Sequence, residues 1–258
     1  MKKCLKSIKK LKKANILLNF NKISKKFFSK NKIKKQFLNQ LLAFSKGPKK
    51  AQWEQNIVKT SLPCIAVSAP KVNQIVKQLS QKNFIDFINL WIWENHTCTL
   101  VIGNLITKID DFETQKQYLI KYAQLADNWA TIDCLKFKFN KQNINQFLEF
   151  SKQLISHSHT FARRLGVVIL LKLCKFPNLI DEIFQTIPLL YAETEYYVNM
   201  AVAWLVCECY IKYKSKTLQL FKTRQLNDFV NNKAISKCKD SFRVTSQDKA
   251  YLSKYKIN

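Results

Sequence analysis

The amino-acid sequence predicts an all-α protein of the HEAT-like helical-repeat class, in which antiparallel helix pairs stack into a solenoid. The 258 residues include only 3 Gly and 5 Pro, which argues against a turn-rich β architecture, and 47% are hydrophobic, which argues against wholesale disorder. Apolar side chains recur at helical spacing along most of the chain, in segments of about two to four turns. Helix pairs of this size bury their apolar faces on one another and give a curved stack with a concave side.

Positive charge is concentrated near the N-terminus. The formal net charge is +27, and residues 1–50 carry 17 Lys and no acidic residue, the first acid being Glu54. Such a balance favours a polyanionic partner, either nucleic acid or an anionic membrane surface. We expect residues 1–30 to form a Lys-rich arm, partly disordered or helical, and residues 31–258 to form the HEAT-like domain. The arm is either a solvated tail or a segment that tracks phosphates, and the sequence leaves both interpretations open.

Start and stop signals divide the rest of the chain into helices. Gly47–Pro48 interrupts the first apolar stripe, Ser68 precedes a proline suited to a first helical turn, and Pro177 ends a later helix. Residues 196–210 show almost no polar face, so we expect that helix to be buried on nearly all sides. In order, the expected helices cover residues 33–44, 50–59, 69–79, 84–91, 100–106, 112–125, 128–133, 143–155, 160–175, 180–190, 196–210, 215–222, 226–239 and 246–254.

The eight cysteines do not form a recognisable metal or disulfide framework, because the sequence contains no C-x-x-C pair. Cys207 and Cys209 lie in an apolar stretch, and His157 and His159 have no further ligand types clustered beside them, so neither pair predicts a zinc site. We therefore expect no metal and no cofactor. Free thiols suit a reducing cytosol, and we see neither a secretory signal nor an apolar run of the ~20 residues that span a bilayer. These observations favour a cytoplasmic, nucleoid-associated protein that does not enter a membrane.

Residues 127–133 combine helix-start residues with a large aromatic and an acid. Asp127 and Asn128 are both suited to cap a helix. If a helix begins there, Trp129 and Asp133 stand four residues apart and share one face. They form either a functional pair or, alternatively, a core tryptophan beside a surface acid that the positive end of the helix dipole favours.

Three strings carry a family resemblance. In order along the chain they are Asn-Trp-Ala-Thr-Ile-Asp at 128–133, Phe-Ala-Arg-Arg-Leu-Gly-Val-Val at 161–168, and Tyr-Tyr-Val-Asn-Met-Ala-Val-Ala-Trp at 196–204. Together they resemble the AlkD-like DNA alkylation repair glycosylases, which have a HEAT-like repeat fold. Weaker likeness at 60–70 and 232–244 extends the resemblance over roughly residues 45–255.

The resemblance implies a metal-free and cofactor-free enzyme that holds duplex DNA in a basic concave cleft. Such enzymes release purines alkylated at N3 or N7, without obligatory base flipping. The resemblance implies that Asp133, Trp129 and Trp204 carry the chemistry. It places the cleft arginine at Arg164, with Arg163 as the alternative if the register is shifted by one.

The remaining expected DNA contacts, Arg243 and Lys233, lie in the C-terminal part of the resemblance. One of the two arginines Arg163 and Arg164 is expected to pair with an acid such as Glu149 or Glu193. Duplex DNA with alkylated purines is the expected partner of a monomer that has no obligate protein partner. Ala130 stands where some active relatives carry a second acid, so a catalytically inactive nucleic-acid-binding scaffold is the alternative, with a protein-docking solenoid third.

Overall fold

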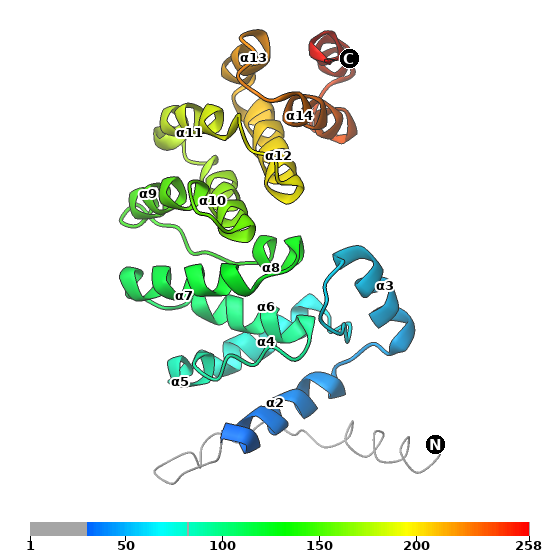
Figure 1. The fold of residues 1–258 in the computed structure, drawn as a ribbon, viewed down its shortest axis with the longest axis vertical. Coiled ribbons are helices and arrows are strands. Elements are labelled where there is room, and N and C mark those ends of the chain that lie inside the picture. The colour runs from blue at the N-terminus through cyan, green and yellow to red at the C-terminus, as the bar shows by residue number, and fades with distance from the viewer. Residues whose placement is uncertain (1–29, 82, 258) are drawn as a thin grey trace. The chain divides into compact units, whose positions relative to one another are not determined.

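The computed structural model describes residues 30–81 and 83–257. Within these ranges the chain forms fourteen α-helices, α2 to α15, and three short 3₁₀ helices, without a β-strand (Figure 1). Helices account for 70% of the described residues, which confirms the expected all-α helical-repeat fold. The expected N-terminal arm lies outside the described residues except for its last position, which begins α2.

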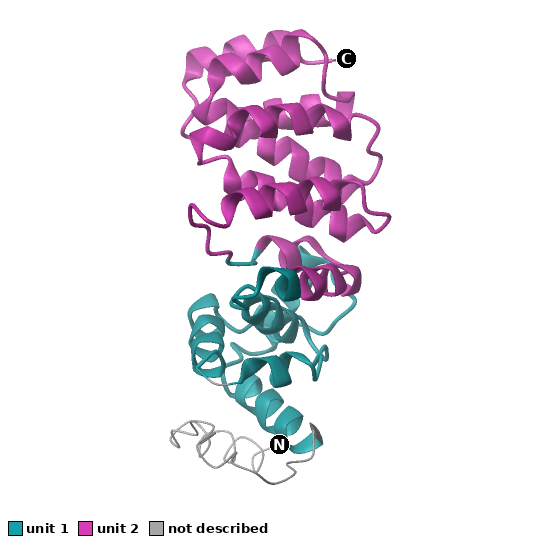
Figure 2. Cartoon of the chain, turned by 90° about the vertical axis from the view of Figure 1, so that its left-hand side faces the viewer, with its two compact units in different colours: residues 1–115, 134–136 teal, residues 116–133, 137–258 magenta. Residues whose placement is uncertain are grey.

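The chain divides into two compact units, and the boundary between them falls within the domain expected over residues 31–258. Unit 1 comprises Met1–Gln115 and Cys134–Lys136, and unit 2 comprises Lys116–Asp133 and Phe137–Asn258 (Figure 2). The boundary falls inside helix α7. None of the described helices combines the length and the apolar character needed to cross a membrane.

Unit 1 follows the expected start signals closely. Phe37 and Leu41 of the first apolar stripe are buried. Pro48 occupies the first turn of α3, and Ser68 precedes α4 with an extended backbone. The helices of this unit are α2 (Lys30–Ala43), α3 (Pro48–Val58), α4 (Ala69–Leu79), α5 (Phe84–Ile88), α6 (His96–Ile106) and the beginning of α7 (Phe112–Leu125).

Two helix boundaries in unit 1 differ from the expectation. The helix expected over residues 84–91 ends three residues early, because Trp91 adopts a left-handed backbone conformation with φ of 43° that an α-helix does not contain. The helix expected over residues 100–106 begins earlier, at His96. The Asn95 side chain accepts a backbone N–H there and caps the helix.

Unit 2 consists of helices that pack in succession, as a helical repeat requires (Figure 2). Helix α10 packs on α8, α9 and α12, and α12 packs in turn on α13 and α14. Gly166 of α10 permits a close approach to α9, since a Cβ added there would lie 2.9 Å from the backbone oxygen of Ser151. After α7 the helices are α8 (Trp129–Asp133), α9 (Ile144–Ile155), α10 (Thr160–Leu173), α11 (Ile180–Thr186), α12 (Tyr196–Lys212), α13 (Lys214–Lys222), α14 (Asp228–Asp240) and α15 (Ser246–Leu252).

Helix α12 is buried around most of its circumference, as its sequence predicts. Between its ends, the partly exposed side chains recur at helical spacing and form one narrow stripe, called the α12 stripe below. The α12 stripe consists of Tyr197, Met200, Trp204, Glu208 and Ile211. Any ligand that touches the middle of α12 has to reach it along this stripe.

Candidate active site

Buried polar side chains hold helix α8 in place. Asn128, which is fully buried, accepts the Thr131 N–H through Oδ1 at 2.9 Å and donates to Thr131 Oγ1 at 2.9 Å. Tyr122 of α7 donates its hydroxyl to the Thr131 carbonyl at 3.0 Å. Asn128 therefore fills the capping role expected for this stretch. The first and last residues of α8, Trp129 and Asp133, are both half-buried.

The Asp133 carboxylate is paired with Arg164 of α10. Arg164 donates from Nε to Oδ1 at 3.0 Å and from Nη2 to Oδ2 at 2.7 Å, a two-pronged geometry that fixes the plane of the carboxylate. The two side chains are only 5% and 10% exposed. Nη1 of Arg164 donates to the Tyr197 carbonyl on α12, and Lys172 donates to the Asp133 carbonyl at 3.2 Å. Helices α8, α10 and α12 thus meet at the guanidinium of Arg164.

Two expectations concern this pair. The sequence suggests that Asp133 lies near a helix start, but it is the last residue of α8, so the adjacent positive charge comes from Arg164 and not from a helix dipole. Arg164 is expected to bind a DNA phosphate, yet its guanidinium is buried and both prongs are on Asp133. In this arrangement Arg164 orients Asp133, and its contact with a phosphate stays a prediction.

Arg163 pairs with Glu193, one of the two acids expected to take up an arginine. Arg163 donates from Nε to Glu193 Oε2 at 2.7 Å, and from Nη1 to the carbonyls of His157 and Ser158 at 3.0 and 2.8 Å. Glu193 also accepts the Glu195 N–H at 2.8 Å. Arg163 thus joins two segments: it holds the link before α10 through the two carbonyls and the link before α12 through Glu193. In this arrangement Arg163 has a structural role.

The two expected tryptophans lie on different helices that both pack on α10. Trp129 opens α8, whereas Trp204 lies on the α12 stripe, seven residues after Tyr197 and therefore on the same side of α12. Both tryptophans are half-buried, so each ring keeps a part that a ligand can touch.

Arg243 and Lys233 have different surroundings. Arg243 follows α14, is exposed, and donates through both Nη atoms to Glu208, one turn after Trp204 on the α12 stripe. The hydrogen bond from Arg243 holds the pKa of Glu208 below its ordinary value. Lys233 is exposed on α14, with Nζ 5.9 Å from the centre of the Phe229 ring. Both cations are accessible to solvent, in contrast to Arg164.

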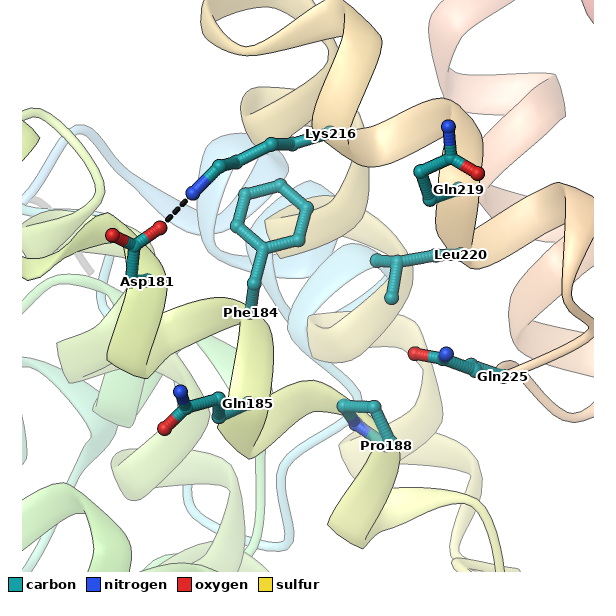
Figure 3. A pocket seen from close by; sticks show the side chains of 8 residues that line it. All are labelled: Asp181, Phe184, Gln185, Pro188, Lys216, Gln219, Leu220 and Gln225. Carbon is teal, nitrogen blue, oxygen red and sulfur yellow. Dashed lines mark ion pairs between the residues drawn. The ribbon is translucent and has the colours of Figure 1, made fainter.

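A cavity of about 510 Å³ opens elsewhere in unit 2, between α11 and α13 (Figure 3). An ion pair between Lys216 and Asp181 closes one side, and Phe184 and Leu220 supply apolar walls. Gln185, Pro188, Gln219 and Gln225 complete the lining. None of the residues expected to act in catalysis or DNA binding lines this cavity, so it is separate from the candidate site.

Sequence reasoning did not identify Tyr197 and Lys172 as part of the site. Tyr197 contributes only its backbone carbonyl, which carries no side-chain signal. Lys172 is one of 40 lysines, and its spacing of eight residues from Arg164, which places both on one face of α10, was the only signal in the sequence. Both hydrogen bonds depend on the fold and cannot be inferred without it.

The family described as DNA alkylation repair enzyme matches residues 37–237 of this chain. That range is most of the chain, and it contains all of α8, α10 and α12 and therefore Asp133, Arg164 and Trp204. Arg243 lies just beyond its end. No curated protein matches the chain. On the extent of the family match, which agrees with the helical-repeat fold, the chain belongs to the DNA alkylation repair enzyme family.

Proposed function

We propose that this chain is a DNA glycosylase that excises cationic N3- or N7-alkylated purines from duplex DNA, a first step of base excision repair. Family membership supports action on alkylated DNA. The single observation that supports cleavage of an N-glycosidic bond is the Asp133 carboxylate, whose side chain is 10% exposed and is held in one orientation by two hydrogen bonds from Arg164. A fixed negative charge is what a reaction with positive charge developing on a sugar needs.

The chemistry follows from the charge of the substrate. Alkylation at N3 or N7 makes the purine cationic, so the base leaves as a neutral molecule when the bond to C1′ breaks and its electron pair moves to the base nitrogen. Positive charge then appears on the deoxyribose, water adds at C1′, and the water proton passes to Asp133 or to solvent. The products are the free base and an abasic site. No cofactor is needed for this step, because the leaving group is already activated.

The size of the electrostatic effect is sufficient to matter. At ~4 Å and an effective dielectric constant of ~20, a carboxylate stabilises a unit positive charge by about 4 kcal/mol, which corresponds to roughly a thousandfold in rate. The positive charge of Arg164 offsets part of this attraction, so the benefit requires that the Asp133 carboxylate approach C1′ more closely than the guanidinium does. Each carboxylate oxygen accepts one hydrogen bond from Arg164 and keeps a further lone pair for the attacking water.

The tryptophans and the exposed cations supply the remaining contacts. Trp129 and Trp204 present aromatic faces to the cationic sugar, each contact being worth about 0.5–2 kcal/mol. Arg243 and Lys233, which are exposed, bind backbone phosphates of a duplex and set its register. We propose that the protein acts as a monomer on DNA and requires no protein partner.

A nucleic-acid-binding scaffold without catalysis is the second candidate. The observation that favours it is that both Asp133 oxygens already accept hydrogen bonds from a buried arginine, an arrangement that also serves as a purely structural pair between α8 and α10. The two candidates share the fold and the DNA contacts. They differ only in whether the base is released.

Incubation with a duplex that carries 7-methylguanine separates these candidates. For a glycosylase we expect free 7-methylguanine in solution and an equal amount of abasic sites, which alkali converts to strand breaks. An unmodified duplex of the same sequence is the control and should give neither product. Binding of the 7-methylguanine duplex without base release, at protein in excess over DNA, would establish the scaffold instead.

A further inference from the structure

Unit 1 contains a second cluster of reactive side chains, formed by Glu54, Cys64 and His96. One potential ligand atom from each residue lies within 4.8 Å of the others. Glu54 comes from α3, Cys64 from the link between α3 and α4, and His96 is the first residue of α6 (Figure 1). His96 is buried, and the other two residues are half-buried. The cluster belongs to a different unit from Asp133 and is not part of the site described above.

Several backbone hydrogen bonds hold the Cys64 segment against the other two residues. The His96 N–H donates to the Pro63 carbonyl at 3.0 Å, which places Cys64 directly beside the start of α6. The Cys64 N–H donates to Gln55 Oε1 at 3.0 Å, and the Ala66 N–H donates to Glu54 Oε2 at 2.8 Å. The three segments are therefore held together before any ligand binds.

The buried imidazole of His96 faces the cluster through Nδ1. Its side chain is only 3% exposed, and Nδ1 lies 2.8 Å from Glu54 Oε1. Nε2 is buried and has no hydrogen-bond partner among the described residues. Nδ1 is therefore the imidazole nitrogen that faces Glu54, and a metal ion shared by the two residues would bind His96 through this atom.

We propose that Glu54, Cys64 and His96 form a zinc-binding site. Imidazole nitrogen, thiolate sulfur and carboxylate oxygen are the three ligand types that Zn²⁺ takes in proteins, and three protein ligands leave a fourth position for water. Thiolate and imidazole together select against Mg²⁺ and Ca²⁺, which prefer oxygen ligands. The negative charges of the carboxylate and the thiolate balance the charge of the ion, and binding releases the thiol proton of Cys64.

The ion links α3, the following segment and α6, and so joins parts of unit 1 that are distant in sequence. Its effect is on the stability of unit 1. No residue of the cluster takes part in the proposed base excision. A negative result for zinc binding would therefore leave the proposed function untouched, and a negative result for base excision would leave the zinc site untouched.

Titration of the purified full-length chain with Co²⁺ after removal of bound metal tests the site. Co²⁺ replaces Zn²⁺ in such sites and gives a near-ultraviolet charge-transfer band when a thiolate is a ligand. We expect this band to saturate at one Co²⁺ per chain and to disappear when Zn²⁺ is added. The Cys64→Ser variant should lose the band, and Glu54→Gln should weaken Co²⁺ binding by about tenfold or more.

The matched control is Cys134→Ser, which removes an exposed thiol assigned to the same unit and should keep the band unchanged. Helix content of each variant, measured by circular dichroism, shows whether it has folded. If Cys64→Ser does not fold, the milder Glu54→Gln variant decides the question. Absence of the band in the wild-type protein, or an unchanged band in a folded Cys64→Ser or Glu54→Gln variant, would overturn the zinc site.

Discussion

Asp133 and Arg164 are 31 positions apart in the sequence and share two hydrogen bonds in the structure. Because both side chains are almost completely buried, removal of one partner leaves a charge in a poorly solvated place. Arg164 also donates to the Tyr197 carbonyl, so its removal affects three helices at once. The pair therefore has a structural role, whatever it does in catalysis.

A double-mutant cycle measures this structural role. Arg164→Met should lower the free energy of unfolding by about 3–5 kcal/mol, because it leaves the buried Asp133 carboxylate without its charged partner. The double variant with Asp133→Asn should be less destabilised than the sum of the two single changes, by about 0.5–3 kcal/mol. Urea unfolding of the four proteins gives the coupling. Strictly additive effects would show that the two side chains do not interact in solution.

The tryptophans allow a comparison with a matched residue. Trp204→Leu and Trp129→Leu should each slow base release by about 2- to 30-fold, the rate equivalent of one aromatic contact with a cation. Trp53→Leu should have no effect on the rate, since Trp53 is 61% exposed and lies in unit 1. The measurement is the single-turnover rate on a 7-methylguanine duplex. If all three variants release the base at the wild-type rate, Trp129 and Trp204 have no role in the mechanism.

At the scale of elements, the link before α10 and the link before α12 depend on Arg163 and Glu193. Burial alone raises the pKa of Glu193, but hydrogen bonds from Arg163 and from the Glu195 and Thr194 N–H groups outweigh it, and the net pKa lies below the ordinary value. A carboxyl group with a lowered pKa in the folded state stabilises the fold above its unfolded pKa. That contribution disappears as the pH falls through the folded pKa.

The Glu193→Gln variant tests this pH dependence. At pH 7 it should be less stable than the wild type, and the difference should shrink as the pH is lowered below the ordinary glutamate pKa of about 4.3. Thermal unfolding across that range gives the comparison. Glu149→Gln, which changes an acid that is 63% exposed, should show little effect at any pH. A Glu193→Gln difference that grows in acid would contradict the assigned ion pair.

The helices were predictable where the deciding residues are local. Pro70 in the first turn of α4 and the capping side chain of Asn128 mark helix starts locally, and the stripe containing Phe37 and Leu41 is visible in the sequence. The early end of α5 was not predictable, because the positive φ of Trp91 depends on the packing of the surrounding chain. Local sequence signals therefore predict where a helix lies, but they do not predict a backbone conformation that depends on tertiary packing.

In the candidate site, too, the residues could be predicted from the sequence but their tertiary contacts could not. The resemblance selected Asp133, Trp129, Trp204 and Arg164, but nothing in the sequence reports that Arg164 meets an acid 31 residues away. The Glu54, Cys64 and His96 cluster has spacings of 10 and 32 residues that match no metal motif. Only the fold brings such residues together.

At the scale of the whole molecule, charge governs the association with DNA. Residues 1–30, the expected N-terminal arm, contain 11 Lys and no acid. Deletion of these residues should flatten the dependence of log affinity on log salt concentration by about 0.9 for each phosphate that their lysines neutralise. A full-length variant with these lysines changed to glutamine should behave like the deletion. An unchanged slope in both proteins would show that the arm does not bind DNA.

The single-turnover rate of 7-methylguanine release by Asp133→Asn tests the central claim most directly. The carboxylate is assigned to stabilise the positive charge that develops on the deoxyribose, so the variant should bind the duplex with wild-type affinity and release the base about 10²–10³ times more slowly. Asp240→Asn, the same change at an exposed position of unit 2, should keep the wild-type rate. A folded Asp133→Asn protein that releases the base at the wild-type rate would contradict the account.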